Sequence, residues 1–181
     1  VRATASMMPS VRRTQESLGQ LPAMASAGGF HLAANFFGGV INTGALAILS
    51  AALPKNASLA RRRLGAEAAL RGMVTAAVWS PFFIAFAIGQ GFVGVENAWI
   101  AIGLGGITAS LFALISIPML NPAFSLTQLK QALDCLKPVL LRLLIVLGAV
   151  VLSAWLFNFT ALSAVVVVMP VLVLLQFIRY P

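Results

Sequence analysis

Long apolar stretches that carry almost no charge constrain this chain more than any other feature. They cover about residues 29–53, 70–89, 97–119, 138–157 and 159–178. About 20 apolar residues at a rise of 1.5 Å each are enough to cross the hydrocarbon core of a bilayer as a helix. The sequence therefore predicts an all-α polytopic integral membrane protein with about five membrane-embedded helices, one of which could be re-entrant.

The overall composition argues against a water-soluble domain. Hydrophobic residues make up 60% of the 181 residues and charged residues 9%, and the mean hydropathy is +0.99. A chain of this length cannot hide so much apolar surface in one core. The net charge of +8 does not indicate nucleic-acid binding, because the arginines cluster between the apolar runs and form no basic stripe with stacking aromatics.

Catalytic and cofactor chemistry has no candidate residues in the sequence. The four carboxylates, Glu16, Glu67, Glu96 and Asp134, fall in loops or at interfaces. The one cysteine, Cys135, rules out an internal disulfide framework, and there is no Cys/His cluster, phosphate-binding glycine loop or hydrolase motif. We therefore expect a protein that is not an enzyme and holds no metal and no cofactor.

The pattern divides the chain into two regions. Residues 1–28 are a polar N-terminal segment with a short helix around 10–19, and they lack the compact apolar run of a secretory signal. Residues 29–181 form the transmembrane helical domain. Its basic segment 54–71 should contain a helix capped by Ser58, and leucines at helical spacing predict an interfacial helix over 125–137, capped by Ser125 or Thr127.

Charge in the connections predicts their side of the membrane. The segments 54–71 and 120–137 are basic and Arg179 follows the last apolar run, whereas the intervening turns hold Glu96 and no basic residue. The positive-inside rule then places both segments and the C-terminus in the cytoplasm, consistently for the four helices from 70 to 178. We expect a multi-pass protein of the bacterial inner membrane.

The stretch 29–53 does not fit this alternation. If it crosses the membrane once, Arg2, Arg12 and Arg13 lie outside, against the rule. Either residues 1–28 are an extracellular loop cut from a longer chain, or 29–53 enters the membrane and returns to the same side by turning near Gly38 and Gly39. We favour the single crossing.

The same stretch carries a polar stripe. On a helix, His31, Asn35 and Asn42 lie within about 40° of one line, with Gly38 near the same face. Amide side chains in hydrocarbon need partners, so the stripe should face protein or a water-filled cavity. It is either a packing seam, where Gly38 and Gly39 permit close approach, or a substrate or ion path lined by amide oxygens.

Two further features concern helix geometry. Pro81, in the motif WSPFF, lies inside the run 70–89 and predicts a kink or break, with Ser80 partly compensating the lost backbone donor. Such a break either bends the helix or exposes backbone groups to a substrate. The run 97–119 carries small residues that predict tight helix packing, namely Ala101, Gly105, Ala109 and Ala113, broadened by Gly103, Gly106 and Ser110.

The motifs GGVINTGA, SLARRRLGAEAALRG and WSPFF together resemble secondary permeases of the ion-transporter superfamily, which includes arsenite, citrate and dicarboxylate carriers. The resemblance covers about residues 20–120. Those families use re-entrant hairpins and unwound helices, with short Asn-Thr motifs around their ions and substrates. The resemblance therefore implies that Asn42 and Thr43 lie in the site, with Gly44 behind them. Ile41 stands where the dicarboxylate branch often has a serine.

These features predict a secondary permease, or a fragment of one, that moves a small solute or anion. Its path would be lined by Asn35, Asn42, Thr43, Ser80 and Pro81. Expected partners are the lipid bilayer, the transported solute or ion, and a second copy or the remainder of a longer transporter; nucleic acid is not expected. The alternative is a non-transporting assembly or accessory subunit, whose polar stripe and small-residue ladder bind partner helices.

Overall fold

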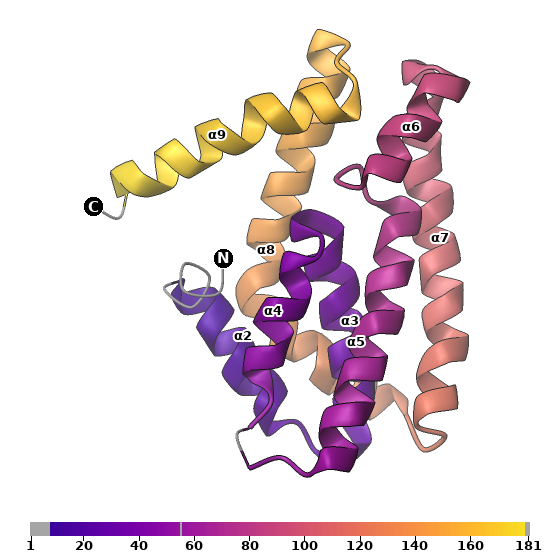
Figure 1. Cartoon of the computed structure of the whole chain (residues 1–181), viewed down its shortest axis with the longest axis vertical. Helices are drawn as coiled ribbons and strands as arrows, with labels where there is room; N and C mark the ends of the chain where they lie inside the picture. The colour runs from indigo at the N-terminus through magenta and orange to yellow at the C-terminus, as the bar shows by residue number, and fades with distance from the viewer. Residues whose placement is uncertain (1–7, 55, 180–181) are drawn as a thin grey trace.

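The structure, a computed structural model, describes residues 8–54 and 56–179, with side chains up to residue 175. This part of the chain contains helices and no strands, which confirms the all-α prediction. The helices are α2 Pro9–Gln20, α3 Ala23–Ile41, α4 Gly44–Ala52, α5 Leu59–Trp79, α6 Ile84–Val93, α7 Val95–Leu120, α8 Leu126–Phe157 and α9 Ala161–Arg179 (Figure 1).

Helix α3 is the centre of the bundle. It packs against α2, α4, α5, α7 and α8, and thirteen of its nineteen residues are buried. Most of these are Ala and Gly, which let neighbouring backbones approach closely, while Phe30 and Phe37 fill the remaining space. The predicted polar segment 1–28 thus holds a helix where one was expected, at α2, and also the first turns of the central helix.

The prediction of one helix over 29–53 is wrong. The chain turns at Asn42 and Thr43, and α3 and α4 pack against each other as a helical hairpin. Asn42 adopts a positive φ of 51°, and its N–H donates to the Gly38 carbonyl at 3.0 Å, which ends α3. Asparagine is one of the residues other than glycine that occur most often at a positive φ. The turn lies beyond Gly38 and Gly39, which remain helical.

The predicted boundary between a basic loop at 54–71 and a helix at 70–89 is also wrong. Helix α5 begins at Leu59, where Ser58 caps it as expected by accepting from the Arg61 N–H at 3.2 Å. It ends at Trp79, and α6 starts only at Ile84. Pro81 has no N–H to donate and its ring crowds the preceding turn, so the expected kink is a complete break over residues 80–83.

The predicted interfacial helix 125–137 and the predicted helix 138–157 are one element, the 32-residue α8. Ser125 begins it, and its N–H donates to the Gln128 side chain. Pro138 lies inside α8 without ending it, because the leucine-rich turns on both sides favour helix. The lower part of α8 lies oblique to its upper part in Figure 1, the bend that an internal proline produces.

The last two helices do not run antiparallel to each other, although only a short connection joins them. Asn158, at φ 53° and ψ 39°, ends α8 in the left-handed conformation. Helix α9 then crosses the upper part of the molecule at a steep angle to α8 (Figure 1). Its first N–H, at Ala161, donates to Gln90 Oε1 at 2.8 Å, which ties α9 to α6. Helix α9 has 19 residues in all, and the side chains of Ala161–Leu175 within it are described.

Three helical stretches are long and apolar enough to cross a membrane: Leu59–Val93, Val95–Leu120 and Leu126–Phe157. The predicted number of about five membrane-embedded helices is therefore not confirmed. The stretch 29–53 is folded into a hairpin, and α9 lies across the bundle. The α4–α5 and α7–α8 connections share one end of the molecule, and the α6–α7 and α8–α9 connections share the other (Figure 1). We call these the basic end and the opposite end.

Candidate functional site at the two helix interruptions

The hairpin turn and the break after α5 lie against each other. Ser80, which is fully buried, donates its Oγ hydrogen to the Gly39 carbonyl, three residues before Asn42. The same Oγ accepts from the Phe82 N–H at 3.1 Å, inside the break. Gly39 also packs directly on the Trp79 ring, where a Cβ would overlap it. The buried Ser80–Pro81 pair therefore holds the end of α5 against the last turn of α3.

The tip of the hairpin carries the polar groups that have no partner of their own. Asn42 is half-buried and Thr43 is exposed, and neither side chain makes a hydrogen bond within the described residues. Helix α4 starts immediately after them, and α6 starts immediately after Phe83. Neither of these helix starts has a side-chain cap in the described chain. Free N–H groups and the positive end of the helix dipole favour an anion at such a start.

Asn35 lies apart from the tip, in the interface between α3 and α5. Its Nδ2 donates to Thr75 Oγ1 at 2.7 Å, and its Oδ1 accepts from the Trp79 Nε1 at 3.3 Å. Thr75 Oγ1 in turn donates to the Gly72 carbonyl at 2.8 Å. Both polar atoms of the Asn35 amide are therefore hydrogen-bonded to side chains of α5. This is expected of a polar side chain in an interface between two packed helices.

His31 lies one turn before Asn35 and is fully buried. Neither of its ring nitrogens has a hydrogen-bond partner among the described residues. The predicted stripe is therefore divided: His31 and Asn35 belong to the interior of the bundle, and Asn42 belongs to the hairpin tip.

The glycines assigned to helix packing fall into two groups. A Cβ at Gly38 would lie 2.7 Å from Met73 Sδ, and one at Gly105 would overlap the Val78 carbonyl and lie 2.8 Å from Trp79 Cα. Ala109, one turn after Gly105, is buried. A Cβ at Gly106 would meet nothing within 4 Å, so this glycine is not in close contact with another helix.

The sequence analysis missed the partners on α5. Gly72, Thr75 and Trp79 meet α3 on one face, and Gly72 allows the closest approach, because a Cβ there would overlap the His31 carbonyl oxygen. A signal was present: Gly65, Ala69, Gly72 and Ala76 repeat at spacings of three and four, as the small residues of 97–119 do. It lay partly inside the segment assigned to a loop.

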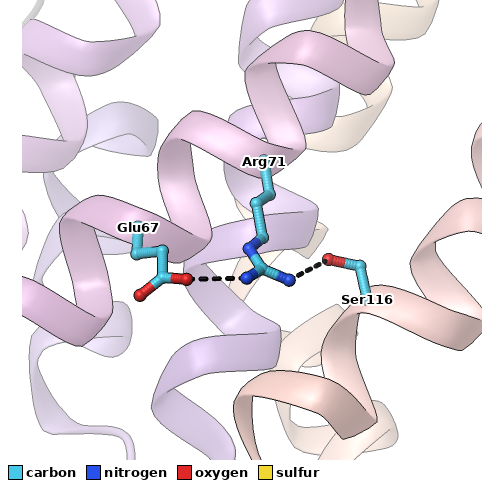
Figure 2. Close-up of polar contacts among 3 residues, drawn as sticks. All are labelled: Glu67, Arg71 and Ser116. Carbon is cyan, nitrogen blue, oxygen red and sulfur yellow. Dashed lines mark hydrogen bonds and ion pairs between the residues drawn. The ribbon is translucent and has the colours of Figure 1, made fainter.

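An ion pair on α5 also contacts α7. Arg71 Nη2 lies 2.7 Å from Glu67 Oε1, and Arg71 Nη1 donates to Ser116 Oγ at 3.4 Å (Figure 2). Ser116 is buried, whereas the side chains of Arg71 and Glu67 are 31% and 54% exposed. The guanidinium therefore links α5 to α7. This contact lies closer to the basic end of the bundle than the hydrogen bonds of Asn35 do.

Breaking this ion pair should change stability little. We expect Arg71→Gln and Glu67→Gln each to lower the free energy of unfolding by less than about 1 kcal/mol, since exposed i,i+4 pairs contribute only tenths of a kcal/mol. Thermal unfolding of the purified protein in detergent measures this. A loss several times larger for Arg71→Gln alone would mean that its contact with Ser116 is the stronger one.

The chemistry of this region is that of amides, hydroxyls and backbone groups. No group of three or more His, Cys, Asp and Glu residues that could hold a metal ion occurs in the part of the chain described. Comparisons with protein-family models, with curated proteins and with solved structures gave no match.

Proposed function

We propose that the protein is a secondary permease of the bacterial inner membrane, or part of one, that moves a small solute or anion. One observation carries the proposal: the hairpin turn at Asn42–Thr43 and the α5–α6 break meet through Ser80 and Gly39. Irregular backbone at membrane depth is tolerated only where it is buried in protein or lines a water-filled cavity. In transporters such interrupted helices form the substrate site.

The residues at the interruptions then have distinct roles. Asn42 and Thr43 offer an amide and a hydroxyl that make no bond within the described chain, and the starts of α4 and α6 offer backbone N–H groups. These groups suit a carboxylate or another oxyanion. Ser80 and Pro81 hold the break in place against α3. The hairpin with an Asn-Thr tip is also the arrangement that the resemblance to the ion-transporter superfamily implies.

The proposed orientation follows from charge. The connections at the basic end carry the Lys and Arg residues of segments 54–71 and 120–137. With that end in the cytoplasm, the hairpin α3–α4 enters from the cytoplasmic side and returns to it.

The accessory-subunit alternative draws on features that the chain uses for its own packing. His31 and Asn35 face the bundle interior, and Gly105 and Ala109 pack internally, with Gly105 against α5. These four residues are therefore not free to bind a partner helix.

Transport can be tested with a variant that spares the backbone. We expect vesicles containing the protein to take up radiolabelled citrate, succinate or arsenite above the level of empty vesicles, and Asn42→Gly combined with Thr43→Val to abolish the uptake. Glycine keeps the positive φ at residue 42, and valine keeps the shape of threonine. Uptake by the folded double variant equal to that of the wild type would remove the hairpin tip from the mechanism.

A further inference from the structure

A groove lies between α7 and α8, and α3 forms its floor. Its volume is about 340 Å³, and α7 and α8 do not pack against each other in the described part of the chain. The walls are mostly apolar, including Phe36, Leu140, Leu144 and Leu147. Of its polar groups, Ser110 Oγ donates to the Gly106 carbonyl at 2.8 Å, and Asn35 bonds to Trp79 as described above. The groove therefore offers a ligand a hydrocarbon surface.

The length of the groove matches one leaflet of a bilayer. Its α7 wall runs from Ile102 to Ala113, which is about 16 Å along the helix axis. Half of a hydrocarbon core about 30 Å thick is about 15 Å. One extended hydrocarbon chain can lie along an apolar groove of this length.

Charge marks one end of the groove. Leu140 lines the end nearer the basic end of the bundle, and Lys137 lies three residues earlier on the same face of α8. The Lys137 side chain is 73% exposed and pairs with Asp134 at 2.7 Å. Lys130 lies two turns before it, also on this face and exposed. The other end of the groove is formed by Val40 and Trp79, beside the helix break.

We propose that this groove binds one acyl chain of an anionic phospholipid from the basic-end leaflet, with the phosphate of its headgroup at Lys137 and Lys130. Anionic headgroups are attracted to lysines at the end of a membrane-spanning helix. The lipid then covers the gap between α7 and α8 up to the level of the break. This inference depends on insertion of the bundle in a membrane and does not depend on the proposed transport.

Trp79 provides a reporter inside the groove. In a variant with Trp99→Phe and Trp155→Phe, Trp79 is the remaining tryptophan. We expect phosphatidylglycerol with brominated acyl chains to quench its fluorescence in vesicles at least twofold more than brominated phosphatidylcholine does. Lys137→Gln with Lys130→Gln should remove this preference, and Arg63→Gln, an exposed change on α5, should keep it.

Two glycines of α7 give a matched pair of steric variants. A Cβ at Gly106 or at Gly103 would meet nothing within 4 Å, but only Gly106 lines the groove. Gly106→Leu should therefore fill the groove and remove most of the quenching, while Gly103→Leu should not. Mass spectrometry of the intact wild-type protein with phosphatidylglycerol should show one retained lipid that Gly106→Leu loses.

Three results would overturn the proposal. Equal quenching in Gly106→Leu and Gly103→Leu would place the acyl chain outside the groove. Equal quenching by the two lipids in the wild type would remove the headgroup contact. A change of oligomeric mass in Gly106→Leu, with no lipid retained by the wild type, would identify a second copy of the chain as the occupant.

Discussion

Gly72→Ala will destabilise the protein by about 1–3 kcal/mol or prevent its folding, although alanine is the better helix former. A Cβ at residue 72 would overlap the His31 carbonyl oxygen and lie 2.9 Å from the His31 carbonyl carbon and 3.0 Å from Ala34 Cβ. Two of these atoms are backbone of the central helix, so no rotamer change relieves the clash. Helix α3 would have to move away from α5, to which it makes its most extensive contact.

Gly103→Ala is the matched control. This glycine is also helical, but a Cβ there would meet nothing within 4 Å. The substitution should leave stability unchanged or raise it by up to about 1 kcal/mol, because alanine loses less backbone entropy on forming a helix. Thermal unfolding of both variants in the same detergent separates the two effects. Equal melting temperatures would contradict the close α3–α5 packing on which the site depends.

The fold class could be predicted from the sequence because it depends on length and hydrophobicity alone. The hairpin was one of two alternatives, and its turn was expected near Gly38 and Gly39 rather than at Asn42. Residues 29–53 read as one apolar run, and whether the chain turns depends on one residue, Asn42, adopting a positive φ. That conformation becomes favourable only when α3 and α4 both pack on their neighbours, as Phe37 and Ile48 do in the common core. The hydropathy of a sequence does not show which helices will pack together.

Some helix boundaries depend on neighbouring residues in the sequence, and others depend on tertiary packing. Ser58 and Pro81 act through their own backbone neighbours, so a cap and a disruption were predictable at these positions. Pro138 is equally conspicuous in the sequence, yet α8 continues through it. A proline therefore predicts a disturbed helix, and the packing on either side decides between a bend and a break.

For the candidate site, the sequence predicted which side chains need partners but not which partners they have. An amide at Asn35 within an apolar run had to be bonded, and its bonds go to Thr75 and Trp79, 40 and 44 residues away. At the helix break, Ser80 helps satisfy the local backbone as expected, by accepting from the Phe82 N–H, and it also donates to the carbonyl of Gly39 on another helix. Contacts of this separation follow from topology, which local patterns do not encode.

Asn35→Ala should therefore act on stability, whereas changes at Asn42 should act on transport. Without the amide, Trp79 Nε1 loses its acceptor and Thr75 Oγ1 loses a donor. We expect a loss of about 1–2 kcal/mol, because two bonds between helices are lost and each such bond in a membrane contributes about 0.6 kcal/mol on average. Thr75→Val should cost less, because it spares the bond from Trp79. The double variant should lose less than the sum of the single losses, by about 0.5 kcal/mol or more.

Flux per folded molecule then separates the two asparagines. If Asn35 only holds the hairpin against α5, Asn35→Ala vesicles should keep wild-type uptake once it is normalised to folded protein, whereas Asn42→Gly vesicles should lose most of it at nearly wild-type stability. Asn35 lies on α3 and Asn42 directly follows the end of that helix, so a global change of α3 would affect both in the same way. If normalised uptake falls equally in both variants, Asn35 belongs to the path, and the division of the stripe proposed here is wrong.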